Sequence, residues 1–261
     1  LALLAVALFL SIRLGHVSFT NLEMLRALTG GDDPILRQIL LEIRLPRALL
    51  GLLVGGGLAL SGSVFQALLR NPLAEPYILG ISGGSAAGAV LVLSLGLASQ
   101  SSIFLPAAAF GGALLAILLV FRVAASAHRR LDVRVLLLAG VVVGAFFTAV
   151  IAFILAISEA NAVRSAVLWM MGSLAGASWG NVAVVAAYTL PAALVLLGLA
   201  RALNLMSVGE ETASYLGTDV ERVKQVAYAV ASLMTAAGVA VAGIIGFVGL
   251  IIPHTLRLLV G

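Results

Sequence analysis

The chain has 261 residues, of which 62% are hydrophobic and 10% are charged, and its mean hydropathy is +1.19. Because about a quarter of the residues of a soluble globular protein are charged, this composition excludes a water-soluble domain and indicates a protein of the lipid bilayer. We interpret the net charge of +4 as loop charge that sets membrane orientation, with no nucleic-acid partner, and the lack of cysteine excludes disulfides and cysteine-based metal sites.

Apolar stretches of about 20 residues, the length that crosses a hydrocarbon core of roughly 30 Å, recur along the chain. They predict seven membrane helices, at residues 1–12, 46–69, 77–97, 103–125, 135–157, 182–203 and 225–245. The first is interpreted as an incomplete span, and a further apolar stretch at residues 246–260 is interrupted by Pro253. Small residues such as Gly84 and Gly88 predict that these helices approach one another closely.

Basic residues are unevenly distributed between the predicted helices. The second, fourth and sixth connections carry eight lysines and arginines, whereas the third and fifth carry only Arg164. The positive-inside rule therefore places the even-numbered connections in the cytoplasm. The first connection, residues 13–45, carries four arginines and contradicts this assignment, but its mixed charges suggest an external segment with short helices.

Residues 55–72 are similar to residues 236–253. The aligned residues with a defined backbone role are Gly57 with Gly238, Gly62 with Gly243, and Pro72 with Pro253. The orientation rule makes the two helices concerned run in opposite directions, which predicts an inverted repeat of the kind found in alternating-access transporters. The first repeat would cover about 46–157 and the second, incomplete, would start at about 225. A chance similarity is the alternative, because the chain is rich in Gly, Ala, Val and Leu.

The sequence contains no recognisable enzyme motif. It lacks a G-x-x-x-x-G-K-[ST] loop, an H-E-x-x-H helix and a G-x-S-x-G turn, and its three histidines lie in different segments. We therefore expect no catalytic residue, no metal site and no cofactor bound by this chain. The predicted membrane helices also contain almost no ionisable residues, which a proton- or sodium-coupled carrier would need. Energy for transport would then enter from a separate protein.

A short polar segment, residues 207–225, separates two apolar stretches and carries helix-capping signals. Ser207 with Glu210 three residues later predicts a capping box. Gly217 is predicted to end a helix, and Thr218 or Asp219 to cap the next one. A solvated linker needs no such signals, so we interpret the segment as a structured surface for a cytoplasmic partner.

Six sequence blocks lie along nearly the whole chain: RLPR at 44–47, NPLAEP at 71–76, LLLAG at 136–140, WMMGSLAGASW at 169–179, GEETASYLG at 209–217 and GFVGLIIPHTLRL at 246–258. Together they resemble the permease subunits of type II ABC importers, the FecCD/BtuC-like family that imports iron-siderophores, haem and cobalamin. The first two blocks and the last one are highly specific for that family.

The resemblance implies roles for individual residues. Arg44 and Arg47 correspond to arginines that dock the periplasmic binding protein. The cytoplasmic gate corresponds to Asn71 and Leu73, with a second strip at Val133 and Arg134, where the cobalamin permease has small hydroxyl residues. Residues 205–224 correspond to the loop that couples the permease to its ATPase. The coupling residues are Ser207, Gly209, Glu210, Glu211, Leu216, Gly217 and Asp219.

The same resemblance implies an architecture and an assembly. The fold would be an all-α, polytopic helical bundle with an inverted repeat, about ten spans in the family and seven to eight here, in one permease domain at residues 1–261. The implied partners are a second permease copy, two ATP-binding subunits that hold ATP and Mg, a periplasmic binding protein, a metal-chelate substrate and membrane lipid. The implied location is the bacterial inner membrane.

The function expected is import of an iron(III)-siderophore-type chelate, with cobalamin or haem as the alternative substrates. A self-contained secondary transporter and a non-transporting scaffold are the alternatives from other classes. From the spans that the second repeat lacks, at roughly 20 residues each with their loops, we also expect the natural subunit to extend about 60–80 residues past Gly261.

Overall fold

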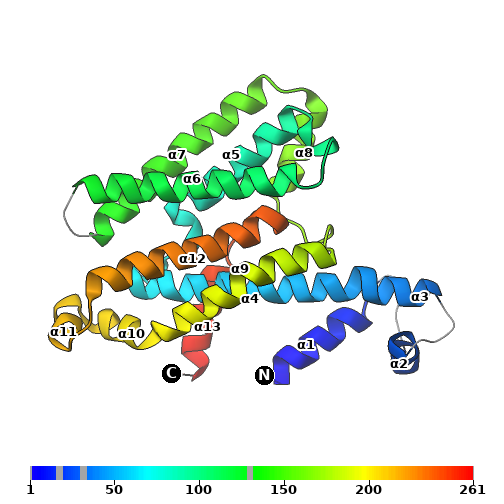
Figure 1. Cartoon of the computed structure of the whole chain (residues 1–261), viewed down its shortest axis with the longest axis horizontal. Coiled ribbons are helices and arrows are strands. Elements are labelled where there is room, and N and C mark those ends of the chain that lie inside the picture. The colour runs from blue at the N-terminus through cyan, green and yellow to red at the C-terminus, as the bar shows by residue number, and fades with distance from the viewer. Residues whose placement is uncertain (1, 16–19, 30–33, 128–131, 261) are drawn as a thin grey trace.

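The computed structural model describes residues 2–15, 20–29, 34–127 and 132–260, and within these ranges the chain is almost entirely helical, with no β-strand (Figure 1). The helices are, in chain order, α1 (Ala2–Arg13), α2 (Asn21–Thr29), α3 (Pro34–Gln38), the π-helical η1 (Ile39–Arg44), α4 (Leu45–Leu68), the 3₁₀ turn η2 (Pro76–Leu79), α5 (Ile81–Ser94), the 3₁₀ turn η3 (Leu97–Ser99), α6 (Phe104–Ala127), α7 (Val133–Ala156), α8 (Ala160–Met170), α9 (Trp179–Gly198), α10 (Ala200–Val208), α11 (Glu210–Tyr215), α12 (Val220–Ala242) and α13 (Val248–Val260).

Five helices in the described ranges are long and apolar enough to cross a membrane. They cover Pro34–Leu68, Phe104–Ser126, Arg134–Ala156, Trp179–Gly198 and Val220–Ala242. Three further apolar helices, α1, α5 and α13, are shorter than a span. The structure thus confirms an all-α polytopic membrane protein and five of the seven predicted spans at full length.

The predicted span at residues 77–97 is wrong in its extent. Residues 76–79 form the turn η2, and Gly80 follows with a φ of +75°, a left-handed conformation that no α-helix contains. Helix α5 therefore begins only at Ile81, and it ends at Ser94, two residues before Gly96, which has a φ of +67°. The 14 helical residues of α5 extend about 21 Å, less than the hydrocarbon thickness.

Helix α13 continues through Pro253, so the predicted interruption there is also wrong. Proline removes the N–H that would bond the carbonyl of Gly249 four residues earlier. That carbonyl instead lies against α4, where a Cβ on Gly62 would overlap its oxygen. The missing hydrogen bond thus coincides with a close approach of α4 and α13.

The helices form two groups (Figure 1). One group contains α5, α6, α7 and α8, and the other contains α4 and α9, with α12 between the two groups. Helix α12 is the most enclosed of the candidate spans, with 67% of its apolar window buried. Val54 of α4 faces Gly238 of α12 and Gly57 faces Met234, so α4 and α12 run in opposite directions, as the orientation rule predicts.

The register of the similarity between residues 55–72 and 236–253 is not shared by the backbone. Gly62 lies inside α4, whereas its aligned partner Gly243 ends α12 with a φ of +70°. Pro72 lies in a turn, whereas Pro253 lies inside a helix. The sequence similarity therefore does not mark equivalent backbone positions in this register.

Small residues hold α5 and α6 together. A Cβ on Gly84 would overlap the carbonyl oxygen of Gly112, one on Gly112 would overlap that of Gly84, and one on Gly88 would overlap that of Ala108. This reciprocal fit is the small-residue packing that lets membrane helices approach closely. It confirms the close packing predicted for Gly84 and Gly88.

The connection between α12 and α13 is fixed by the segment that follows α4. The Tyr77 hydroxyl donates to the carbonyl of Ile245 at 3.1 Å and accepts from the N–H of Ile245 at 3.3 Å. Glu75 Oε1 accepts from the N–H of Phe247 at 3.1 Å, and Phe247 has a φ of +67°. The Glu75–Phe247 bond joins the NPLAEP block to the GFVGLIIPHTLRL block, and all three bonds orient the start of α13.

Candidate functional site

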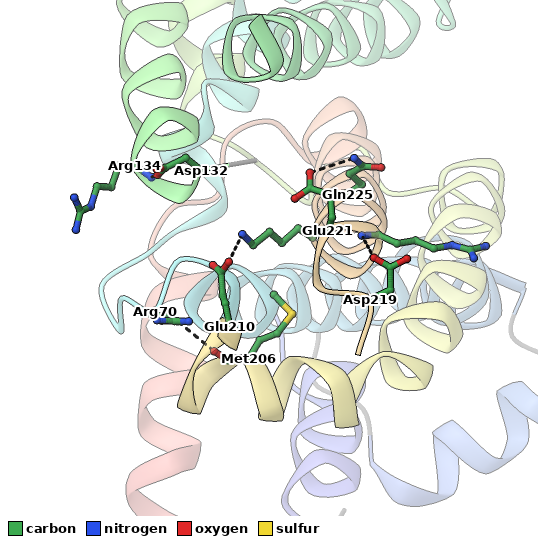
Figure 2. Close-up of polar contacts among 10 residues, drawn as sticks. Arg70, Asp132, Arg134, Met206, Glu210, Asp219, Glu221 and Gln225 are labelled. Atoms are coloured by element: carbon green, nitrogen blue, oxygen red, sulfur yellow. Dashed lines mark hydrogen bonds and ion pairs between the residues drawn. The ribbon is translucent and has the colours of Figure 1, made fainter. Parts of the chain in front are cut away.

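Three connections that are far apart in the sequence lie at one end of the molecule. They are the turn after α4, the start of α7 and the α10–α11 segment, and Figure 2 shows polar residues of all three in one close-up. These are the even-numbered connections that carry most of the basic residues. The structure therefore places at one end of the molecule the three connections that the charge pattern assigned to the cytoplasmic side.

The α10–α11 segment is folded and capped, although not at every predicted position. Residues 213–218 form a Schellman motif, in which Gly217 N–H bonds Ser214 and Thr218 N–H bonds Ala213, at 2.9 and 3.0 Å. Gly217 has a φ of +84°, so its predicted helix-ending role is confirmed. Asp219 is the N-cap of α12, and its Oδ1 accepts from the N–H of Arg222 at 3.2 Å.

The predicted capping box at Ser207 is wrong. Ser207 lies inside α10, which continues to Val208, and its hydroxyl donates to the carbonyl of Asn204 at 2.7 Å. The N-cap of α11 is Gly209, which has no side chain to cap with. Helix α10 continues past the predicted boundary because Leu203 and Met206 on its inner face are buried.

Glu210 does not complete a capping box and instead forms an ion pair. Its Oε2 lies 2.5 Å from Nζ of Lys224 on α12, and only 7% of the Lys224 side chain is exposed, against 37% for Glu210. The ion pair therefore ties α11 to the first turns of α12. Sequence reasoning missed Lys224, because its partner is 14 residues away on another helix and no local spacing rule links them.

The proposed gate turn begins where α4 ends. Asn71 Oδ1 accepts from the N–H of Leu73 at 2.9 Å, which closes a small Asx turn, and 69% of Leu73 is exposed. Just before it, Arg70 Nε donates to the carbonyl of Met206 on α10 at 3.2 Å (Figure 2). The turn is thus in direct contact with the α10–α11 segment.

The other side of this turn is held from within the helix bundle. The amide of Gln66, which is 2% exposed, donates to the carbonyls of Ala74 at 3.4 Å and Leu250 at 3.2 Å. Its Oε1 accepts from the guanidinium of Arg257 on α13. Sequence reasoning missed Gln66 and Arg257, and the available signal was a polar residue inside each of two apolar helices.

The second predicted gate strip lies at the start of α7. Asp132 caps this helix, because its Oδ1 accepts from the N–H of Arg134 at 2.7 Å. The Arg134 side chain is exposed and points outward (Figure 2). The side chain of Val133 lies outside the described part of the chain.

The two arginines predicted to dock a binding protein lie at the opposite end of α4. The helix has 24 residues and is about 36 Å long. Arg44 is half-buried and donates to the carbonyls of Ile12 and Arg13, at 2.8 and 3.0 Å, so it caps the end of α1. Arg47 is exposed and donates to the carbonyl of Ala175 at 3.3 Å. Arg47 is therefore the more accessible of the two.

Within the described ranges, no group of three or more His, Asp or Glu side chains is arranged to hold a metal ion.

The remaining members of the predicted coupling set lie on the α10–α11 segment, where Glu211 is exposed and Leu216 is 63% exposed. The arrangement offers two polar ends joined by apolar helices.

Known proteins with similar sequences are transport permeases. A cobalamin import system permease protein from Halobacterium salinarum is 45% identical over 219 residues, which are 84% of this chain and 58% of the relative. A hemin transport permease protein of Yersinia pestis is 39% identical and covers 85% of this chain and 67% of its own length. An iron(3+)-hydroxamate import permease protein of Bacillus subtilis is 36% identical, with 99% and 78% covered. The chain thus spans 58% to 78% of the length of these relatives.

A solved structure shares the whole fold. It is described as an inward-facing conformation of a metal-chelate type ABC transporter, and it matches 100% of this chain and 80% of its own with a TM-score of 0.88 and 33% identity. The model of the FecCD transport family matches residues 3–261. With nearly every residue matched, this multi-pass membrane protein belongs to the FecCD transport family.

Proposed function

We propose that this chain forms the translocating permease subunit of an ABC importer, in which a separate ATP-binding subunit supplies the energy. The observation that carries the proposal is the capped α10–α11 segment at the basic end of the molecule. It exposes large apolar side chains outside the candidate spans, with 79% of Val208, 89% of Tyr215 and 63% of Leu216 accessible. A folded segment with exposed aromatic and aliphatic residues has the features of a protein-docking surface.

The opposite end of the molecule would receive the substrate from a binding protein. Arg47 is exposed there, and its guanidinium can form paired hydrogen bonds with a carboxylate of the partner. Arg44 already donates to the carbonyls at the end of α1, so it would hold the docking surface in place and not contact the partner itself. The chain itself is a transport component, and ATP with Mg would be held by the ATP-binding subunit.

The substrate class we propose is a metal chelate, with an iron(III)-siderophore first. This follows the iron(3+)-hydroxamate relative, which matches 99% of the chain. Cobalamin is the second candidate, because the relative with 45% identity is named for cobalamin import, and haem is the third. We further propose that two permease copies and two ATP-binding subunits assemble in the bacterial inner membrane.

Reconstituted uptake tests this function. The full-length subunit, its ATP-binding subunit and its binding protein would be placed in proteoliposomes and offered a ferric hydroxamate, cobalamin or haemin in turn. ATP-dependent accumulation of one chelate, abolished when the ATP-binding subunit is omitted, is the expected result. Accumulation that needs a proton or sodium gradient and no ATP would favour a secondary transporter and contradict the proposal.

A further inference from the structure

Arg70, at the end of α4, has an unusual backbone conformation. Its φ is +46°, in the left-handed region that glycine usually occupies. The N–H of Arg70 bonds the carbonyl of Ala67 at 3.3 Å, and the N–H of Asn71 bonds that of Gln66 at 3.1 Å. These two bonds make a Schellman motif with Arg70 at the position where glycine is most common. A strained residue at such a position suggests that its side chain has a function.

The side chain of Arg70 forms a hydrogen bond with a neighbouring helix, α10. Its Nε donates to the carbonyl of Met206 at 3.2 Å (Figure 2). Met206 lies in the last turn of α10, where carbonyls have no donor within the helix and carry partial negative charge. A guanidinium is suited to cap such a helix end, and glycine at position 70 would leave the carbonyl without this donor.

The turn that Arg70 begins is attached at two points. On one side, Arg70 bonds α10, which continues through Gly209 into α11. On the other side, the buried amide of Gln66 holds the carbonyl of Ala74. Between these attachments lie Asn71 and the exposed Leu73. A displacement of α10 would therefore reach this turn directly.

We propose that Arg70 is a positioning residue that transmits movement of the α10–α11 segment to the turn at Asn71 and Leu73. The inference rests on the proposed function, because it needs an ATP-binding subunit that moves α10–α11. It accounts for an arginine where the backbone favours glycine. If the Arg70 side chain is removed, the ATP-binding subunit would still bind and hydrolyse ATP. The turn at Asn71 and Leu73 would no longer follow the movement of α10–α11.

These 261 residues contain no cysteine, so a single labelled position can measure this movement once any cysteine elsewhere in the transporter has been replaced by serine. Leu73→Cys in the full-length subunit would be labelled with bimane, and its fluorescence recorded in the complete transporter with and without ATP. Arg70→Gly removes the side chain and relieves the strain, whereas Arg70→Lys keeps a positive donor. Phe247→Gly is the matched control, because it relieves the other positive φ of a non-glycine residue in the described chain, at a side chain that is 66% exposed.

We expect Arg70→Gly to lose the ATP-dependent fluorescence change and to lower the substrate transported per ATP about tenfold. Arg70→Lys should restore part of the change, and Phe247→Gly should keep all of it. If Arg70→Gly responds to ATP like the Leu73→Cys parent, Arg70 has only a structural role and the inference is wrong. A Leu73→Cys parent that transports with ATP but shows no fluorescence change would also overturn the inference, because the turn then does not move. An unmodified transporter without ATP-dependent transport would instead overturn the proposed function and this inference with it.

Discussion

The close packing of α5 on α6 predicts opposite effects for two adjacent substitutions on α6. Gly112→Ala would place a methyl group against the carbonyl oxygen of Gly84, with the N–H of Gly88 also near, at 3.3 Å. Gly111→Ala would place the same methyl group in open space, since nothing lies within 4 Å. Both residues are in the interior of one helix, so their effects differ only through what the methyl group meets.

The expected magnitudes follow from two opposing contributions. Replacing glycine by alanine inside a helix stabilises it by about 0.5–1 kcal/mol. Overpacking a well-fitted contact costs about 1–3 kcal/mol, and backbone atoms cannot move aside as a flexible side chain can. Gly112→Ala should therefore destabilise the fold by about 1–2 kcal/mol, while Gly111→Ala should stabilise it by up to about 1 kcal/mol.

Thermal unfolding of the detergent-solubilised subunit, followed by tryptophan fluorescence, measures both variants. The tryptophans in these 261 residues are Trp169 and Trp179, so neither substitution removes a reporter. A lower midpoint for Gly112→Ala and an unchanged or higher one for Gly111→Ala is the expected result. Equal midpoints would refute the argument that reciprocal glycine contacts hold α5 against α6.

Three further predictions concern the two polar ends. Gly217→Val should destabilise α11 by about 1–2 kcal/mol and abolish transport-linked ATP hydrolysis, because Gly217 has a φ of +84°, whereas Gly217→Asn should retain most activity; normal stimulation in the valine variant would remove this turn from the mechanism. Glu210→Gln should destabilise the fold by about 1 kcal/mol through its pair with Lys224, measured by thermal unfolding, and an equal effect from Glu211→Gln would exclude that pair as the cause. Arg47→Glu should weaken binding-protein affinity about tenfold in a titration, with Arg47→Lys intermediate, and unchanged affinity would contradict the docking role.

The membrane class and most of the spans were predictable because they depend on average hydrophobicity over about 20 residues. Such a window does not detect a single left-handed residue. Gly80 delays the start of α5, and this glycine is no different in the sequence from those inside α4. Gly217 and Asp219 were predictable, since their capping roles depend on neighbours a few residues away.

Roles that depend on contacts between distant segments were not predictable from local pattern. Arg44 caps α1 from about 30 residues away in the sequence. Ser207 matched a capping pattern, but burial of Met206 on the inner face of α10 extends the helix past it. Arg70 drew attention only as one basic residue in a connection, because its backbone strain and its bond to Met206 exist only in the folded chain.

The contacts of Tyr77 explain why movement of α10 would bend only the turn after α4. They prevent displacement of the whole segment from Arg70 to Tyr77. Tyr77 holds both backbone groups of Ile245 in the connection between α12 and α13. That connection is itself enclosed, since a Cβ on Gly172 would lie 2.5 Å from the carbonyl oxygen of Ile244, and Ser173 N–H bonds the carbonyl of Ala242 at 2.7 Å. With its far end fixed in this way, the segment can respond to α10 only near Arg70, where Asn71 and Leu73 lie.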